Sequence, residues 1–245
     1  MTAPQPDAAP AADTLVFFYD VDNTLLDNDR LKSEVDAQLD GLLGVAWSDT
    51  FWQLYEAVRQ EGDVVDIPET LRRFAQLCPD ETICSQAHAI FAEMDFAAYL
   101  YPGALAALAH TAQFGTNVIL SDGDLVFQRD KIEKSGIAEA ADCQVRIYTH
   151  KEQHLAELLA DFPAAQYLMV DDKPRIGKAM KPLLGNRLHI VFVCQGKYAY
   201  DAAGRADFQP DLTLAGIADI CAYSAAEFRS GQFHRQGVCN PPPTA

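Results

Sequence analysis

Five short apolar runs, rich in β-branched and aromatic residues, constrain the fold of this chain more than any other feature. Each run ends near polar residues, as strands do, and they span residues 15–20, 117–121, 144–148, 166–171 and 188–194. Four are apolar almost throughout, which is typical of parallel strands covered on both faces, whereas 144–148 alternates as an edge strand does. Because helical patterns separate the runs, the sequence predicts an α/β fold with a Rossmann-like parallel sheet.

This alternation is interrupted between residues 30 and 99, where we find no strand pattern. Apolar residues instead recur at helical spacing, for example Phe51, Leu54 and Val58. The sheet resumes after Tyr101-Pro102-Gly103, because Pro and Gly end regular elements. We therefore predict a core formed by residues 14–29 and 100–230 and a helical cap domain, residues 30–99, inserted after the first strand. The tails, 1–13 and 231–245, are expected to be disordered.

Charge and composition exclude several kinds of protein. The formal net charge is −16 and the sequence holds no basic patch, so no nucleic acid partner is expected. The amino terminus lacks the basic and apolar segments of a secretory signal, and no apolar run approaches the roughly 20 residues of a membrane helix. The six cysteines form neither a Cys-x-x-Cys pair nor a Cys/His cluster. We expect incidental thiols, a cytoplasmic location and no membrane association.

Polar side chains follow the predicted strands at the edge where a parallel sheet places its functional site. They are Asp20 and Asp22 after the first strand, Ser121 and Asp122 after the second, Lys151 after the third, and Asp171 and Asp172 after the fourth. Converging carboxylates repel one another unless a cation binds between them. Oxygen ligands of this kind suit Mg²⁺, which also binds substrate phosphate. The sequence therefore indicates a magnesium and phosphate site.

These motifs, in this order, resemble those of the haloacid dehalogenase-like superfamily of phosphatases. The resemblance covers about residues 15–221 and includes Asp20-x-Asp22-x-Thr24, Ser121 and Lys151, together with the 171–172 aspartate pair. It implies that Asp20 attacks phosphorus and forms an aspartyl-phosphate, while Asp22 acts as general acid and then as general base. Dehalogenases and phosphonate-cleaving members lack the second aspartate, so the resemblance favours phosphate esters.

The resemblance also implies the metal ligands. Mg²⁺ would be held by the Asp20 carboxylate, the Asp22 backbone carbonyl and a carboxylate of the fourth strand. Within the final pair, Asp172 aligns better as the direct ligand, and Asp171 would lie behind it. The Lys173-Pro174-Arg175 segment departs from the family pattern, in which small or acidic residues are frequent at this place.

The same resemblance implies a set of phosphate-binding residues. Ser121 would donate to a phosphate oxygen and Lys151 would offset the negative charge of the nucleophile and the phosphate. Asp122 and Thr24 belong to the same group of positions, and Thr24 is also expected to order the loop after the nucleophile. Lys131, on the helix after the second motif, is interpreted as a solvent-facing residue.

The inserted helices resemble the cap of members that act on small metabolites. We therefore predict a phosphatase for a small phosphorylated metabolite. A phosphomutase, which passes the phosphoryl group to a second hydroxyl, and a non-catalytic phosphate- or metal-binding relative stay open as alternatives. The cap cations that could contact a substrate are Arg30, Lys32, Arg72 and Arg73. Their spacing does not distinguish among them.

Overall fold

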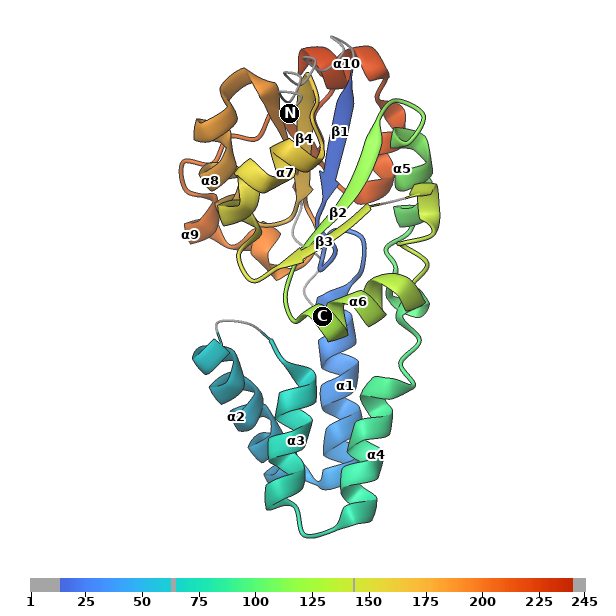
Figure 1. The fold of residues 1–245 in the computed structure, drawn as a ribbon, viewed down its shortest axis with the longest axis vertical. Coiled ribbons are helices and arrows are strands. Elements are labelled where there is room, and N and C mark those ends of the chain that lie inside the picture. Colours follow the sequence, from blue (N-terminus) through green and yellow to red (C-terminus); the bar gives the residue numbers. More distant parts are fainter. Residues whose placement is uncertain (1–13, 63–64, 143, 240–245) are drawn as a thin grey trace, which may run out of the picture.

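The computed structural model of the chain describes residues 14–62, 65–142 and 144–239. Its core is one parallel sheet with the strand order β3-β2-β1-β4-β5-β6 (Figure 1). The strands are β1 (Leu15–Tyr19), β2 (Thr116–Asp122), β3 (Gln144–Tyr148), β4 (Gln166–Asp171), β5 (Leu188–Val193) and β6 (Leu212–Leu214). The predicted α/β fold is confirmed, and β3 lies at an edge. The sequence does not predict strand β6, because three residues are too few to show the alternation of apolar and polar residues typical of a strand.

Helices cover both faces of the sheet. On one face, Phe17 of β1 meets Phe228 of α10 (Ala225–Ser230) edge to face, with ring centroids 5.1 Å apart, beside α5 (Ala104–Thr111). On the other face, Phe18 packs in one cluster with Leu158 of α7 (Leu155–Asp161) and Met180 of α8 (Pro174–Leu184). Successive strand residues point to opposite faces, and each buried side chain contributes about 1.5–3 kcal/mol. The two layers therefore fix the strand ends that carry the site.

Shorter elements complete the core. Helix α6 (Leu125–Lys134) follows β2, and α9 (Ala202–Arg205) lies between β5 and β6. Turns of 3₁₀ helix occur at Phe96–Tyr99, Ala140–Asp142, Lys151–His154, Gly185–Arg187, Lys197–Tyr200 and Ile217–Ala222. Within the described ranges, none of the helices has the length and apolar character needed to cross a membrane.

Four helices between β1 and β2 form a separate lobe below the sheet, which we call the cap (Figure 1). They are α1 (Asn28–Leu43), α2 (Val45–Gly62), α3 (Ile67–Leu77) and α4 (Glu81–Ala92). Asp27 and Asp66 begin α1 and α3, because their carboxylates accept hydrogen bonds from first-turn N–H groups. Phe51 packs against Phe74 and Phe91, with centroids 5.7 and 5.6 Å apart. The apolar stripes of α2, α3 and α4 thus meet inside the cap.

The direction in which the chain adds strands to the sheet reverses between β1 and β4. The connection through the cap explains one half of this reversal. It leads from β1 to β2 on one side, whereas β4 lies on the other side of β1. A site is expected where such neighbouring strands diverge. The chain returns to the sheet at Gly103, whose φ of 80° is left-handed and whose added Cβ would lie 2.6 Å from the Cβ of Ala218. Only glycine fits this return.

The carboxyl-terminal segment differs from the disordered tail that we predict. Residues 231–239 are described, and the Gly237 N–H donates to the Thr213 carbonyl at 2.6 Å. Cys239 forms a disulfide with Cys194, which follows β5, so these two cysteines are not the incidental thiols expected from their spacing. The disulfide joins residues 45 positions apart, and the sequence holds no local signal for it. The predicted tail 1–13 and residues 240–245 lie outside the described residues.

Candidate active site

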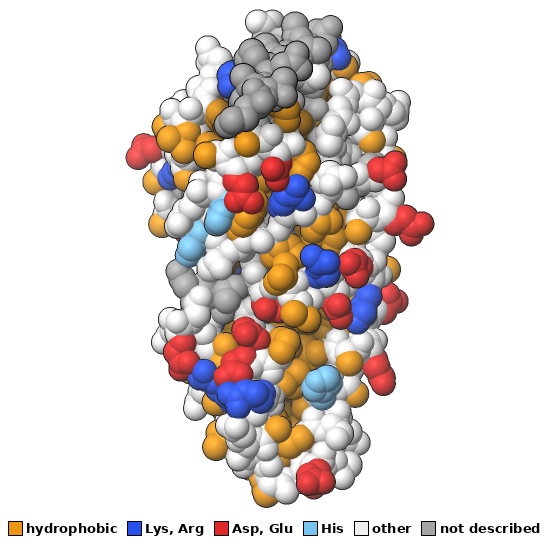
Figure 2. Space-filling model, viewed as in Figure 1, with side chains coloured by type: hydrophobic (Ala, Val, Ile, Leu, Met, Phe, Trp, Pro, Cys, Tyr) orange, Lys and Arg blue, Asp and Glu red, His pale blue; other side chains and the backbone are white. Residues whose placement is uncertain are grey.

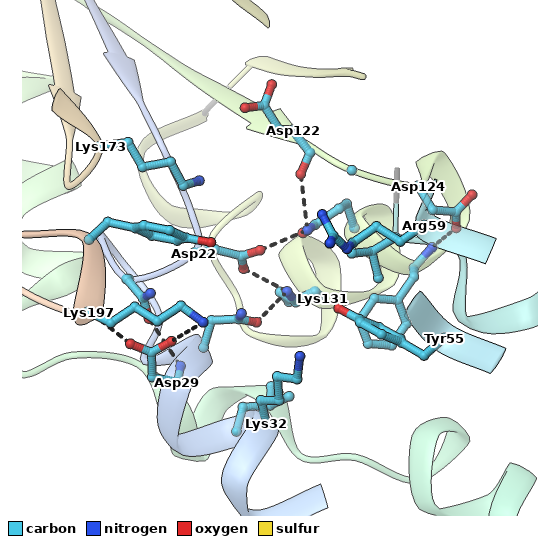
Figure 3. Close-up of a pocket in the computed structure, with 18 of the residues that line it drawn as sticks. Asp22, Asp29, Lys32, Tyr55, Arg59, Asp122, Asp124, Lys131, Lys173 and Lys197 are labelled. Carbon is cyan, nitrogen blue, oxygen red and sulfur yellow. Dashed lines mark hydrogen bonds and ion pairs between the residues drawn. The ribbon is translucent and has the colours of Figure 1, made fainter. Parts of the chain in front are cut away.

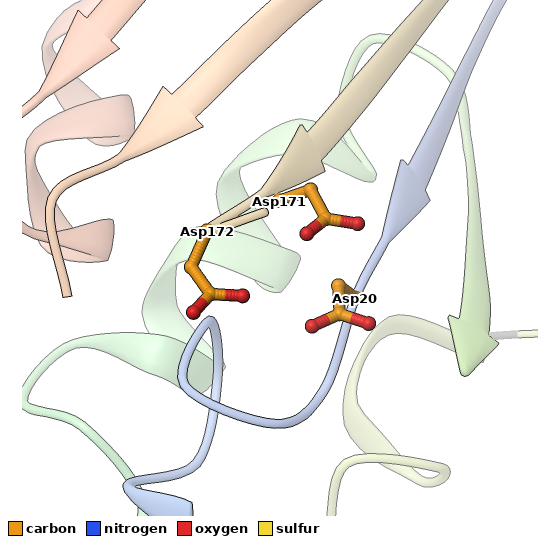
Figure 4. A group of neighbouring side chains, drawn as sticks. All are labelled: Asp20, Asp171 and Asp172. Carbon is orange, nitrogen blue, oxygen red and sulfur yellow. The ribbon is translucent and has the colours of Figure 1, made fainter. Parts of the chain in front are cut away.

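The centre of the site lies at the carboxyl ends of β1 and β4. One carboxylate oxygen from each of Asp20, Asp171 and Asp172 lies within 4.8 Å of the others. Figure 4 shows the three carboxylates gathered beyond the two strands. Asp20 is held to β4 by its N–H, which donates to the Val170 carbonyl at 2.9 Å. All three aspartates are at most 4% exposed, so the sheet concentrates negative charge where little water can screen it.

Lys151 supplies the first positive charge of this cluster. It is fully buried, and its Nζ lies 2.5 Å from Asp20 Oδ1 and 2.7 Å from Asp171 Oδ2. Burial alone would lower the pKa of Lys151, but these carboxylates outweigh it and raise that pKa. Burial likewise would raise the pKa of Asp20, yet the neighbouring lysines lower it. Lys151 thus keeps the predicted nucleophile ionised.

A second lysine, Lys173, joins the carboxylates. Its Nζ lies 3.7 Å from Asp20 Oδ2, and its side chain is 16% exposed. Burial favours the neutral amine, but the carboxylates of Asp20, Asp171 and Asp172 raise the pKa of Lys173. The sequence departure at residues 173–175 therefore brings another cation to the site. The sequence does not predict this role of Lys173, because the role depends on the side chain turning back toward β1.

Asp172 fits a metal ligand better than Asp171 does. The Asp171 carboxylate accepts a hydrogen bond from the Lys173 N–H at 2.8 Å and is paired with Lys151. Both Asp172 oxygens are buried, and neither has a hydrogen-bond partner among the residues that the structure describes. Burial raises the pKa of Asp172 well above its ordinary value. Since buried polar atoms are normally satisfied, a cation between Asp20 and Asp172 suits this donor set, and oxygen ligands suit Mg²⁺.

Thr24 and Ser121, two of the predicted phosphate-binding residues, lie close to the nucleophile in the fold. The Thr24 hydroxyl donates to Asp20 Oδ2 at 3.4 Å and accepts a hydrogen bond from the Asp172 N–H at 3.1 Å. It therefore ties the loop after β1 to the end of β4. Ser121 is buried near the end of β2, the strand beside β1.

The Asp122 side chain, predicted among the phosphate-binding residues, contacts two cationic residues. Its Oδ1 accepts a hydrogen bond from the Lys151 N–H at 2.8 Å, and its Oδ2 accepts one from Arg175 at 2.9 Å. These contacts position Lys151 and Arg175, and the phosphate-binding role of Asp122 stays a prediction.

Asp22 lies apart from the three buried aspartates and faces a cavity (Figure 3). Lys131 Nζ donates to its Oδ1 at 2.6 Å, and Gln128 Nε2 donates to its Oδ2 at 3.0 Å. The Lys131 side chain is 2% exposed and also contacts Asn28 Oδ1 at 3.0 Å, so the interpretation of Lys131 as solvent-facing is wrong. Gln128 and Lys131 share one face of α6 by their spacing, but spacing does not reveal that this face meets Asp22.

The cavity lies between the core and the cap and has a volume of about 720 Å³. Asp22 and Lys173 line it from the core, whereas Lys32, Tyr55 and Arg59 line it from the cap (Figure 3). This volume is within the range of small-molecule sites, about 300–1,000 Å³. On the face drawn in Figure 2, acidic and basic side chains lie interspersed, without a continuous basic area.

Comparisons with solved structures find this fold in other proteins. A haloacid dehalogenase-like hydrolase from Burkholderia xenovorans LB400 is 39% identical, with a TM-score of 0.79 over 87% of this chain and 97% of that chain. L-2-haloacid dehalogenase from Xanthobacter autotrophicus, with chloropropionic acid covalently bound, is 18% identical, with a TM-score of 0.53 over 84% and 96%. The HAD-hydrolase YfnB from Bacillus subtilis, bound to magnesium, is 13% identical, with a TM-score of 0.54 over 84% and 96%.

The last two similarities concern the fold alone, because their sequence identities are low. No family model matches the chain, and no curated protein does. Of the three proteins described, the Burkholderia hydrolase, at 39% identity, is therefore the one that is similar in sequence as well as in fold.

Proposed function

Because the chain belongs to the haloacid dehalogenase-like hydrolases, we propose that it hydrolyses the phosphate monoester of a small metabolite through an aspartyl-phosphate on Asp20. Asp20 is buried, ionised and paired with Lys151, as a carboxylate nucleophile requires. The cavity that Asp22 faces, two residues after Asp20, has the volume of a small-molecule site.

The Asp22 carboxylate is the observation that carries the choice of a phosphate ester. A halide leaves carbon without a proton, whereas the alkoxide released from a phosphate ester needs one. Asp22 faces the cavity two residues after the nucleophile, and Lys131 and Gln128 hold both of its oxygens. Dehalogenation would leave this ordered carboxylate without a chemical task.

The buried carboxylates support a magnesium requirement. Asp20 and Asp172 would hold Mg²⁺, with the backbone carbonyl of Asp22 as a further ligand, and the orphaned oxygens of Asp172 are the reason for this choice. When bound, the ion would neutralise charge on the transferring phosphoryl group. Lys151 keeps Asp20 in place and ionised, and Lys173 adds a second positive charge beside it.

The residues of the chain then divide the reaction into two steps. In the first, an Asp20 oxygen forms a bond to phosphorus, the ester P–O bond breaks, and Asp22 gives its proton to the leaving oxygen. In the second, Asp22 takes a proton from water, whose oxygen bonds to phosphorus as the Asp20 O–P bond breaks. Inorganic phosphate leaves and Asp20 is regenerated.

Replacing Asp20 tests the proposal. With Mg²⁺ present, the wild-type protein should release phosphate from 4-nitrophenyl phosphate, and Asp20→Asn should lower kcat by at least about 10⁴-fold. Asp130→Asn is the matched control, because Asp130 is a half-exposed aspartate paired with Lys134 on α6. EDTA should abolish the activity and MgCl₂ should restore it.

Four outcomes would contradict the proposal. Turnover that survives Asp20→Asn would exclude the nucleophile, and turnover that survives EDTA would exclude the metal. Chloride release from 2-chloropropionate without phosphatase activity would indicate a dehalogenase. Conversion of a sugar phosphate to its isomer without phosphate release would instead indicate a phosphomutase.

A further inference from the structure

The cations of the cap differ in whether they already have partners. Arg30 is bonded to Glu34 at 2.9 Å and to the Ala98 carbonyl, also at 2.9 Å. Arg72 and Arg73 both bind Glu69, at 2.5 and 2.7 Å. Among the residues lining the cavity, none of these three arginines is present. Their charges are therefore used within the protein and not in the cavity.

Lys32 is the exception. It lines the cavity, and Figure 3 shows its side chain pointing into it. Within the described part of the chain, no carboxylate lies within ion-pair distance of its ammonium. Its Nζ instead lies 4.9 Å from the ring centroid of Trp52 and 4.6 Å from that of Tyr55. Burial against these rings, together with Lys197, lowers the pKa of Lys32.

Two further cations line the same cavity and act electrostatically on Lys32. Arg59 of α2 is paired with Glu56 at 2.7 Å, and Lys197 lies 3.7 Å from Asp29. Both line the cavity and add to the positive potential at Lys32. Three cations from α1, α2 and the turn after β5 thus line the cavity near enough to influence one another, and we call them the distal corner (Lys32, Arg59 and Lys197).

Each carboxylate that lines the cavity is bonded elsewhere, so Glu56 and Asp29 favour the charged form of Lys32 only from a distance and not through an ion pair. Their described partners are Lys131 for Asp22, the Lys197 N–H for Asp29, Arg59 for Glu56, Arg175 for Asp122, and helix N–H groups for Asp124 and Asp201. The unmatched charge in this set is the Lys32 ammonium. A buried or half-buried charge without a counterion is unfavourable, so a ligand anion would be stabilised there.

Apolar side chains also line the cavity. They are Leu31, Val35, Phe91 and Phe127, from α1, α4 and α6. An apolar part of a bound ligand would pack against them.

We propose that the distal corner binds a second anionic group, a carboxylate or a phosphate, at the far end of the substrate from the phosphoryl group that is transferred. This inference rests on the proposed function for the phosphoryl end only. The substrate class is then a phosphate monoester with an apolar linker and a terminal anion, and Lys32 selects for that anion.

Binding of unreactive probes tests the distal corner without turnover. The full-length protein with Mg²⁺ is titrated calorimetrically with 4-(phosphonomethyl)benzoate and with its carboxamide, which has the same shape but no second charge. The carboxylate should bind about tenfold more tightly, the usual effect of one charge-assisted hydrogen bond. The affinities of phosphonates with shorter alkyl spacers show which linker length the cavity prefers. The affinity of a phenylene bisphosphonate shows whether the second anion is better a phosphate or a carboxylate.

Variants of Lys32 test whether this residue causes the preference for the carboxylate probe over the carboxamide. Lys32→Gln should bring the ratio of the two affinities to about one, and Lys32→Arg should restore it. Arg72→Gln, a change of an exposed and paired cap cation, should leave the ratio unchanged. Circular dichroism of Lys32→Gln and Lys32→Met checks that the cap stays folded.

Equal affinity for the two probes in the wild-type protein, at every spacer length, would overturn the proposal. A preference that persists in Lys32→Gln and Lys32→Met would also overturn it. The outcome is separate from the proposed function: a protein that prefers the dianionic probe but hydrolyses no ester has the distal corner without the phosphatase activity. A protein that hydrolyses aryl phosphates but does not prefer the dianionic probe has the phosphatase activity without the distal corner.

Discussion

On the core side of the cavity, Asp20, Lys151 and Asp172 are at most 1% exposed, whereas on the cap side Arg59 and Glu56 are 49% and 45% exposed. Water screens the cap charges, so their ion pairs are weak and can be exchanged for a ligand. The core charges are poorly screened, so Asp20 and Lys151 must keep their pairing with each other. The difference suggests a division of labour, in which the core fixes the reaction and the cap selects the substrate.

Replacing Lys151 should disturb this comparison most. Lys151→Met leaves Asp20 and Asp171 as buried carboxylates without their shared cation. Breaking a buried pair in this way should lower the free energy of unfolding by about 3–5 kcal/mol and abolish turnover. Urea denaturation at neutral pH measures the change.

Arg59→Met is the matched change on the cap side. It breaks an exposed pair, and the free energy of unfolding should change by less than about 1 kcal/mol. Equal losses in the two variants would contradict the difference between core and cap.

Lys131 tests whether Asp22 is held for proton transfer. Lys131→Met removes the contact of 2.6 Å to Asp22 and should lower kcat/KM for an alkyl phosphate about a hundredfold, within the range of general acid catalysis. The loss should be smaller, about fivefold, for 4-nitrophenyl phosphate, whose leaving group needs no proton. Steady-state kinetics with both substrates measures the difference.

Lys134→Met is the control for this prediction, because Lys134 lies on the same helix, is 44% exposed and pairs with Asp130. It should leave both rates unchanged. An equal loss on the two substrates in Lys131→Met would mean that Lys131 supports the fold and not the proton transfer.

The core half of the site could be predicted from sequence, and the cap half could not. Asp20 and Asp172 follow continuously apolar strands, and parallel strands end at one edge, so their meeting is a consequence of local pattern. Lys131 and Lys173 depend on how a helix and a side chain turn toward neighbours distant in sequence. Lys32 could not be distinguished from Arg30, two residues away, because the rotation of α1 against the core decides which one faces the cavity.

The disulfide offers a test outside the site. Cys194 precedes the Lys197–Tyr200 turn, and its bond to Cys239 closes a loop across 45 positions. Cys239→Ser should lower the free energy of unfolding by about 2–4 kcal/mol, because the unfolded chain gains freedom. Thermal unfolding with and without dithiothreitol measures this, and the reductant should not affect the variant. A wild-type protein insensitive to reductant would contradict the prediction.

Acid sensitivity should also differ between the two regions. Burial would raise the pKa of Asp211, but His189, Lys181 and the Ile190 N–H outweigh it and lower that pKa to about 2. A lowered pKa stabilises the fold above the ordinary value of 3.8 and ceases to do so as the pH falls through about 2. Asp211→Asn should therefore cost about 2 kcal/mol at pH 7 and about half of that near pH 3.

Glu69 provides the cap counterpart of Asp211. Its pKa is also lowered to about 2, by hydrogen bonds from Arg72 and Arg73, but this cluster lies at the surface of the cap, where the Arg72 side chain is 57% exposed. Water and salt screen such a pair, so Glu69→Gln should show no pH-dependent change in urea denaturation between pH 7 and about pH 3. If Glu69→Gln lost stability with the same pH dependence as Asp211→Asn, cap ion pairs would be as strong as core ones.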